Sequence, residues 1–296
     1  MDAEAGWKQA GESGGKGTGS GRKEEGSDPG EVLERRLKEI SSELQSSGFW
    51  DSSQRIILQS LRKPFMMDED EDNIPSLEKL NISENFQCVS FGIGNFSSCS
   101  VAKTQMAFLL LLLQELQISR DCCFVFDPVF SELELEVLCR LGLKVMAENE
   151  EGKHGISGVR TLFFMVHCGK SLYNNLLWSN WAPETLSKMA VLGNSFRGIQ
   201  DRMPSKIFQK EYSYIAKILP ATDETPFPAH PQYMEIFNDT SVHCFPSSKL
   251  KELSGEIWKL PEEPVYEENE EGQLEIIRKS QKKGICTDFE ANEKKS

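Results

Sequence analysis

Apolar and polar positions follow two different rhythms along this chain of 296 residues. Short apolar runs, many of them rich in β-branched and aromatic residues, predict seven strands. Most of these runs are separated by stretches with the three-to-four-residue spacing of amphipathic helices. The predicted strands are 87–91, 122–126, 144–147, 161–166, 189–192, 214–219 and 240–245.

Helices are expected between most of these strands. The longest apolar run, MAFLLLLL at 106–113, lies in a predicted helix over 101–116. Eight residues are too few to span a bilayer, which needs about 20, so this run predicts a buried helix. Further helices are predicted over 131–141, from 171 onward, over 204–211 and over 249–258.

Strands that alternate with helices form parallel sheets with helices on both faces. Residues 86–260 therefore predict an α/β domain, a Rossmann-like three-layer sandwich with a mostly parallel sheet. The last two predicted strands lack a long helix between them, so we expect them to pair antiparallel. That arrangement would resemble the seven-stranded sheet of Rossmann-like methyltransferases.

The N-terminal part of the chain predicts a helical extension. Residues 31–63 hold two helices, the first with apolar residues at 33, 37, 40 and 44. Asp51 is the expected N-cap of the second helix. Residues 1–30 are rich in Gly, Ser, Lys and Glu and are expected to be disordered.

Two charged segments flank the predicted sheet domain. Residues 64–85 contain the run DEDED and predict a solvated acidic linker. Residues 261–296 form a charged tail that is expected to be mostly disordered. The chain is thus expected to hold one α/β domain with disordered termini.

The charge balance narrows the possible partners. Lys and Arg total 33 and Asp and Glu total 46, which gives a net charge of −13. Nucleic-acid binders and proteins that adhere to anionic membranes show basic surfaces, so neither class is expected. Protein partners are expected, without any indication of which.

Cysteine usage predicts the compartment. The eight cysteines form no CxxC pair, and no signal peptide precedes them. They are therefore expected to be reduced thiols of a cytoplasmic protein, with the nucleus as a second compartment. The four histidines show no metal-ligand spacing, so no metal site is predicted.

The stretch FGIGNFSSC, at 91–99, joins the first strand to the long apolar helix. Gly92 and Gly94 permit a tight turn and a close approach of a ligand, and Asn95 follows them. Free N–H groups at the start of a helix attract anions and hydroxyls. Ser97 stands where a dinucleotide loop has its third glycine, so the stretch predicts either a nucleotide-like ligand site or a plain turn with helix caps.

Four more polar residues follow predicted strands. Because ligands of open α/β sheets bind beyond the carboxyl ends of the strands, these residues are candidates for the same site. They are Asp127, Glu148, His167 and Asn194. Asp127 stands where a ribose-binding carboxylate is expected, and the alternative is that it caps the next helix.

Two pairs of adjacent polar residues have structural interpretations. His167 and Cys168 are neighbours on a strand, so their side chains point to opposite faces and Cys–His catalysis is not expected. Asn174 and Asn175 lie within a predicted helix although asparagine is a poor helix former. They are interpreted as buried amides that bond to loop backbone.

Several motifs together resemble those of the Sensitivity to Red Light Reduced family. They are FGIGNF (91–96), FDPVFSELE (126–134), ENEEGK (148–153), MVHCG (165–169), LYNNLLWSNW (172–181), VLGNSF (191–196) and FNDTSVHCFP (237–246). The resemblance implies a regulatory protein linked to haem biosynthesis and to circadian clock-gene expression, and it carries over no catalytic residue. Phe91, Val166 and Cys244 depart from the pattern, where Tyr, Pro and an aromatic residue are more usual.

Three functions follow from these observations. The first is a regulator in haem biosynthesis and rhythmic gene expression that acts through partners or a small ligand at the sheet edge. The second is a methyltransferase-like enzyme that uses an adenosyl cofactor, and the third is a non-catalytic scaffold. An open pocket at 92–96 would favour the first two, and a loop filled by its own side chains would favour the third. The sequence predicts no particular cofactor.

Overall fold

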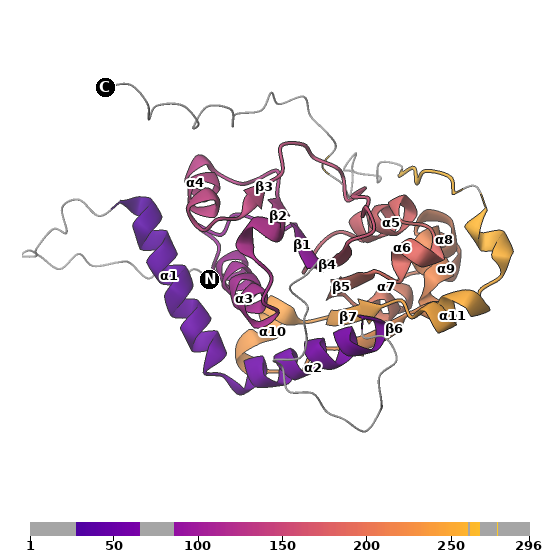
Figure 1. The fold of residues 1–296 in the computed structure, drawn as a ribbon, viewed down its shortest axis with the longest axis horizontal. Coiled ribbons are helices and arrows are strands. Elements are labelled where there is room, and N and C mark those ends of the chain that lie inside the picture. Colours follow the sequence, from indigo (N-terminus) through magenta and orange to yellow (C-terminus); the bar gives the residue numbers. More distant parts are fainter. Residues whose placement is uncertain (1–27, 66–85, 260, 267–276, 278–296) are drawn as a thin grey trace, which may run out of the picture.

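The computed structural model describes residues 28–65, 86–259, 261–266 and 277 (Figure 1). It contains a seven-stranded sheet in the order β3-β2-β1-β4-β5-β7-β6. The strands are β1 (Phe86–Phe91), β2 (Cys123–Phe126), β3 (Lys144–Val145), β4 (Arg160–Met165), β5 (Met189–Asn194), β6 (Asp223–Pro226) and β7 (Thr240–Cys244). The pairs among β1 to β5 are parallel, and β7 is antiparallel to both β5 and β6. The predicted α/β class and mostly parallel sheet are confirmed.

Helices cover both faces of this sheet. The helices are α1 (Pro29–Gln45), α2 (Gly48–Phe65), α3 (Ser100–Glu115), α4 (Glu132–Arg140), α5 (Lys170–Ser179), α6 (Pro183–Leu186), α7 (Phe196–Asp201), α8 (Ser205–Glu211), α9 (Ser213–Ile218), α10 (Met234–Phe237) and α11 (Ser247–Glu252). Successive residues of β4 point to opposite faces: Leu162 and Phe164 join the core with α1 to α4, whereas Phe163 and Met165 join the core with α5 and α9.

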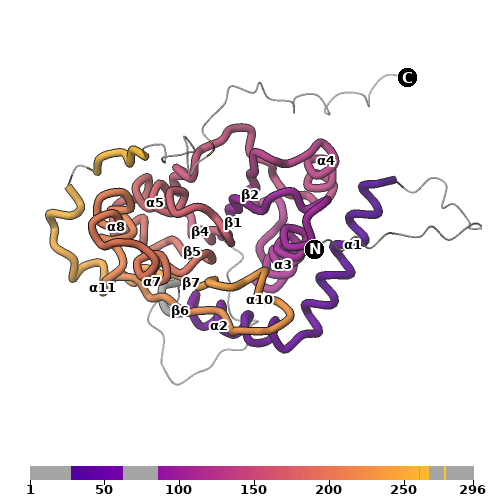
Figure 2. Tube along the Cα trace, turned by 180° about the vertical axis from the view of Figure 1, so that it is seen from behind, coloured from indigo at the N-terminus to yellow at the C-terminus, as the bar shows by residue number. Residues whose placement is uncertain are grey.

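The predicted buried helix is α3, whose residues Met106 to Leu113 are all buried. The sheet covers one side of α3, and α1 packs beside it, where Ser41 Oγ donates to the carbonyl of Ala107 at 3.2 Å. Figure 2 shows α1 beside α3 and α2 along the β6–β7 side of the sheet. Within the described part of the chain, no helix is both long and apolar enough to cross a membrane.

The prediction of a strand over 214–219 is wrong. Residues Ser213–Ile218 form helix α9, Leu219 begins a 3₁₀ turn, and the sixth strand is β6, in a segment for which no element was predicted. The Asn174 side-chain oxygen accepts the backbone N–H groups of Tyr214 and Ile215 at 2.9 and 3.2 Å and so holds the first turn of α9. Periodicity cannot separate a helix from a strand in so short an apolar run.

Other boundaries also move. Asp51 is not an N-cap, because α2 begins at Gly48 and places Asp51 in its first turn. The predicted closing helix is broken into α11 and a 3₁₀ turn over Gly255–Trp258. Helix α1 begins at Pro29, two residues before the expected start. The expected disorder of 1–27, the linker over 66–85 and most of the tail beyond 266 lie outside the described residues.

The buried asparagines of α5 bond to backbone, as expected. Asn175 Nδ2 donates to the carbonyl of Glu151 at 2.7 Å, and Asn174 holds α9 as described above. Both amides also bind Tyr266 from the C-terminal segment: its hydroxyl lies 3.0 Å from Asn174 Nδ2 and 3.0 Å from Asn175 Oδ1. These two residues therefore fasten three separate parts of the chain to α5.

Candidate functional site

The glycine loop after β1 turns sharply at two positions. Gly92 and Gly94 have φ values of 71° and 81°, a region that side chains with a Cβ disfavour. A Cβ on Gly92 would lie 2.5 Å from Cys168 Sγ, whereas a Cβ on Gly94 would meet Ala102 at an ordinary 3.7 Å. The first glycine is therefore required by packing as well as by backbone conformation.

Asp127 closes this loop from within the protein. Its two carboxylate oxygens accept the backbone N–H groups of Gly94 at 2.7 Å and of Val129 at 3.0 Å. Burial raises the pKa of Asp127, although both of these hydrogen bonds act to lower it. The structure thus brings Asp127 and Gly94 together. The carboxylate accepts the hydrogen bond that the Gly94 N–H would otherwise donate to a ligand. The N-cap of the next helix, α4, is Ser131 and not Asp127.

A second carboxylate, Glu134, fills the turn before α3. It is fully buried, and it accepts the backbone N–H of Ser97 at 2.6 Å and the N–H and hydroxyl of Ser131 at 2.7 and 2.8 Å. Asn95 Oδ1 accepts the N–H of Ser98 at 3.1 Å. Sequence reasoning missed Glu134, although the Ser131-x-x-Glu134 spacing is that of a capping box.

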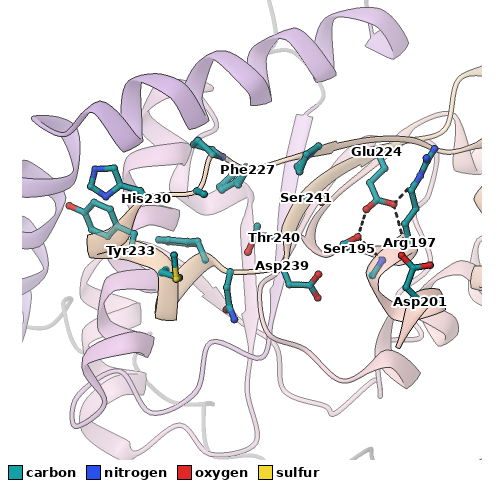
Figure 3. A pocket seen from close by; sticks show the side chains of 17 residues that line it. Ser195, Arg197, Asp201, Glu224, Phe227, His230, Tyr233, Asp239, Thr240 and Ser241 are labelled. Carbon is teal, nitrogen blue, oxygen red and sulfur yellow. Dashed lines mark hydrogen bonds and ion pairs between the residues drawn. The ribbon is translucent and has the colours of Figure 1, made fainter. Parts of the chain in front are cut away.

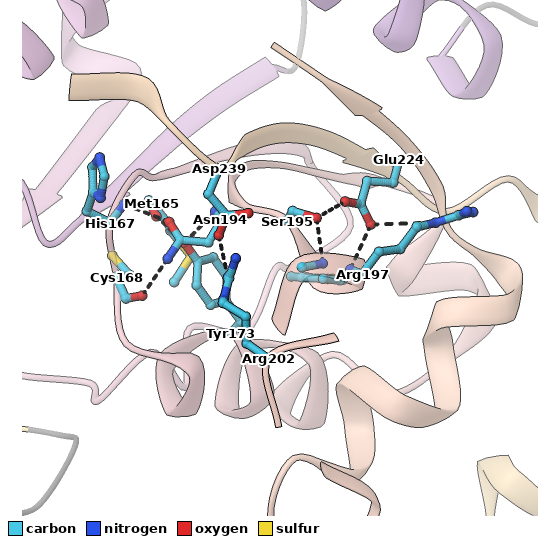
Figure 4. A network of polar contacts seen from close by, with 12 residues as sticks. Met165, His167, Cys168, Tyr173, Asn194, Ser195, Arg197, Arg202, Glu224 and Asp239 are labelled. Carbon is cyan, nitrogen blue, oxygen red and sulfur yellow. Dashed lines mark hydrogen bonds and ion pairs between the residues drawn. The ribbon is translucent and has the colours of Figure 1, made fainter. Parts of the chain in front are cut away.

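His167 and Asn194 meet where β4 and β5 end (Figure 4). Asn194 Oδ1 accepts the N–H of His167 at 2.9 Å, and Asn194 Nδ2 donates to the carbonyl of Cys168 at 3.2 Å. The backbone N–H of Asn194 donates to the hydroxyl of Tyr173 at 2.9 Å. His167 has a φ of 59°, which is uncommon for a residue other than glycine. The Asn194 amide therefore holds a strained turn in place.

Cys168 is not arranged as a nucleophile. Its Sγ lies 3.3 Å from the carbonyl oxygen of Phe91, and burial raises its pKa well above the usual range of a thiol. The ring of His167 instead has its Nε2 2.9 Å from the carbonyl of Ile236. This geometry fits the expectation that the two neighbours do not act as a catalytic pair.

Glu148 lies apart from the other candidates. It follows β3, which is two strands from β1 in the sheet, and its side chain is exposed. It borders a hollow that is also lined by Phe124, Lys144 and Met146. The structure therefore gathers the candidates into two pairs, Gly94 with Asp127 and His167 with Asn194, and places Glu148 at the far end of the same edge.

Sequence reasoning missed a cluster beyond β5. Ser195 Oγ donates to Glu224, and Glu224 Oε2 accepts the backbone N–H of Arg197 at 3.2 Å (Figure 4). Glu224 Oε2 also lies 3.9 Å from His243 Nε2. Burial lowers the pKa of His243, and the nearby Glu224 opposes that effect.

Asp239 begins the turn into β7 and completes this cluster. Its carboxylate pairs with Arg202, and its carbonyl accepts the N–H of Ser195 at 2.7 Å. Asp239 has a φ of 58°, so it is strained in the same way as His167. The pairing depends on the antiparallel register of β5 and β7, which joins Asn194 to Thr240.

A cavity of about 670 Å³ lies between α7 and the connection from β6 to β7 (Figure 3). Aromatic residues of the connection form one side, and the cluster around Glu224 forms the other. Thr240 and His230 are among the residues that line this cavity, and their atoms Thr240 Oγ1 and His230 Nδ1 are buried without a hydrogen-bond partner. Among the residues that the structure describes, no group of three or more His, Cys, Asp or Glu side chains is placed to hold a metal ion.

Comparisons with known proteins agree on one family. The SRR1 domain model matches residues 58–244. A mouse SRR1-like protein is 40 % identical over 68 % of this chain and 86 % of its own length. The Arabidopsis thaliana Protein SENSITIVITY TO RED LIGHT REDUCED 1 is 29 % identical over 75 % of this chain and 77 % of its own length.

A Drosophila melanogaster SRR1-like protein is 30 % identical over 74 % of this chain and 71 % of its own length. No solved structure is a significant match. The family match begins inside α2 and ends at the last residue of β7, so it spans the whole sheet and the glycine loop. The chain therefore belongs to the SRR1 domain family.

Proposed function

We propose that this chain is a non-catalytic regulatory protein that acts in haem biosynthesis and clock-gene expression by binding a small ligand at the carboxyl edge of its sheet. Membership of the SRR1 family supports a regulatory role, and a relative from Arabidopsis carries red-light sensitivity in its name. The links to haem and to the clock come from the family resemblance. The buried thiol of Cys168, bonded to the Phe91 carbonyl, supports a binding role over covalent catalysis.

The observation that carries this proposal is the strain at His167 and Asp239. Both residues have positive φ and both lie at the carboxyl edge, on either side of Asn194 and Ser195. Non-glycine residues in this conformation cost roughly 1–3 kcal/mol each and collect at functional positions. We therefore expect the ligand to bind at this edge close to the turn of His167, which Asn194 holds, and the turn of Ser195, with Gly92, Gly94, Asn95 and Asp127 shaping the adjoining loop.

Glu148 is the outer limit of the proposed edge. In this proposal, protein partners in the cytoplasm or in the nucleus recognise the chain when its ligand is bound. The net charge of −13 supports protein partners over nucleic acid.

Rescue in cells tests this proposal. Cells that lack the chain would receive either the wild type or Asn194→Leu, and the period of a clock-gene reporter and the haem content would be measured. We expect the wild type to restore both readouts and Asn194→Leu to restore neither, at equal protein levels. The exposed substitution Glu252→Gln is the matched control.

Two outcomes would reject this proposal. If the wild type changes neither readout, the regulatory role is wrong. If Asn194→Leu rescues as well as the wild type, the role is real but needs no ligand at this edge, and the scaffold is the better description.

A methyltransferase-like enzyme is the second candidate, and the sheet favours it. The seven-stranded sheet, in which β7 runs antiparallel to both of its neighbours, supports the predicted resemblance to Rossmann-like methyltransferases. Against it, the Gly94 amide is already bonded to Asp127. Calorimetric titration with S-adenosylmethionine decides between them: micromolar binding that Asp127→Ala changes would favour the enzyme, and no heat at millimolar ligand would reject it.

A further inference from the structure

We propose that the cavity between α7 and the β6–β7 connection is the ligand site, and that it takes a neutral planar aromatic molecule with a hydrogen-bonding substituent such as an amide. This inference rests on the proposed function, which places a ligand at this edge of the sheet. It adds the position of the ligand and its chemical class. The volume of the cavity, about 670 Å³, lies within the range of small-molecule sites, about 300–1,000 Å³.

The first observation is the unsatisfied hydroxyl of Thr240. This residue lines the cavity and is 3 % exposed, and its Oγ1 is buried without a hydrogen-bond partner. Buried polar atoms without partners are rare and call for an explanation, of which a bound water, ion or ligand group is one. In Figure 3, Thr240 lies between the aromatic side of the cavity and the polar side. A ligand that spans the cavity would pass over this hydroxyl.

The second observation is the aromatic wall. Phe227, Tyr233 and Phe237 line the cavity together with His230, whose Nδ1 also lacks a partner. Phe49 of α2 supports this wall from outside the cavity: its ring centroid is 6.1 Å from Phe227, 4.8 Å from Tyr233 and 5.3 Å from Phe237. A wall held in this way presents rings and ring edges against which a planar aromatic ligand can pack.

The third observation is the state of the charged groups. Asp239 is paired with Arg202, and Glu224 accepts Ser195 Oγ and the N–H of Arg197. Asp201, the remaining carboxylate of the wall, is exposed at the end of α7. A charged ligand would enter a cavity whose buried charges already have partners, and burying an unpaired charge is costly. A neutral molecule with a donor and an acceptor avoids that cost and can satisfy Thr240 and His230.

Benzamide is the probe, because it is neutral and planar and its amide is both donor and acceptor. Binding to the full chain would be followed by ligand-detected NMR at millimolar concentrations. Benzoate has the same shape with a negative charge, and cyclohexanecarboxamide keeps the amide without the aromatic ring. We expect benzamide to bind at least tenfold more tightly than either comparison molecule.

Thr240→Val keeps the shape of the side chain and removes the hydroxyl. It is expected to weaken benzamide about tenfold, the loss of one hydrogen bond. Ser90→Ala is the matched control, because Ser90 Oγ is also buried without a partner but lies in β1, outside the cavity. If Thr240→Val fails to fold, Ala229→Trp replaces it: Ala229 is exposed and lines the cavity, so a bulky ring there should block binding.

The site is rejected if the wild type shows no binding of benzamide. It is also rejected if the cavity variant that is used binds as tightly as the wild type, or if benzoate binds equally well. These outcomes are separate from those of the cell assay. A chain that binds benzamide but does not restore the clock or haem readouts rejects the proposed function alone, and a chain that restores them without binding benzamide rejects this site alone.

Discussion

The carboxylate of Asp127 accepts the backbone N–H of Gly94 across the carboxyl edge of the sheet, at 2.7 Å. Asp127 was expected to bind the ribose of a ligand, and the loop at 92–96 was expected to bind a nucleotide-like group. Instead, Asp127 hydrogen-bonds to the backbone of that loop. Together with Glu134 on the amide of Ser97, it gives the loop internal partners. A ligand at this point would have to displace a protein carboxylate.

Asp127→Asn should therefore lower stability. Each of the two carboxylate oxygens accepts one N–H, from Gly94 and from Val129, and an amide has only one oxygen to offer. One N–H is left without its partner, at a cost of about 1–3 kcal/mol. Urea unfolding measures this, with the exposed Glu252→Gln expected within about 0.5 kcal/mol of wild type. An Asp127→Asn chain as stable as the wild type would mean that these bonds contribute little.

Gly92→Ala should destabilise the chain more than Gly94→Ala. Both substitutions place a Cβ at positive φ, which costs about 1–2 kcal/mol. Only at Gly92 does the new carbon also meet Cys168 Sγ, at 2.5 Å. Adding Cys168→Ala to Gly92→Ala should recover part of the loss, whereas adding it to Gly94→Ala should not. Equal effects in the two backgrounds, measured by chemical denaturation, would contradict the contact.

Stability should fall as the pH falls below about 6.5, partly through His243. Its side chain is fully buried, and burial lowers its pKa in the folded chain from the usual 6.5. Between the folded pKa and 6.5 the unfolded chain binds the extra proton, so protonation favours unfolding. Unfolding free energies at pH 7.5, 6.5 and 5.5 measure the slope. His243→Asn should flatten it, and an unchanged slope would assign the pH dependence to other groups.

Tyr266→Phe should cost about 1 kcal/mol, although Tyr266 lies near the end of the described chain. Its hydroxyl bonds to the side chains of Asn174 and Asn175, so its loss leaves two buried amide groups with one partner fewer. The exposed neighbour Val265 offers a control, since Val265→Ala removes little buried surface. Thermal melting compares the two, and equal midpoints would mean that the C-terminal segment is not fastened through this hydroxyl.

The central strands could be predicted because both of their faces are buried. Val89, Phe163 and Val191 lie in such strands, and their neighbours are apolar as well. β6 escaped prediction because it is an edge strand of the polar sequence Asp223–Pro226, with no buried residue to reveal it. The helix α9 was misread because its conformation depends on Asn174, about 40 residues earlier in the chain. Local pattern carries no information about such a partner.

The candidate site was predictable only in outline. Strand ends placed Asp127, His167 and Asn194 on one edge, because parallel strands share their carboxyl ends. The partners of these residues could not be read from the sequence. Glu224 and Asp239 reach the same edge only because β7 pairs with β5 on one side and with β6 on the other. The sequence does not reveal that β7 lies between these two strands.

The contact between Phe49 and Phe237 has a consequence for synthesis on the ribosome. Helix α2 is made early, yet its partners include Phe237 and also Cys244, whose Sγ reaches the carbonyl of Ser60. About 190 residues separate Phe49 from Phe237, which at about 5–20 residues per second is about 10–40 s of translation. During that time Phe49 of α2 lacks its contact with Phe237. The nascent chain is thus exposed to premature association until its last strand emerges.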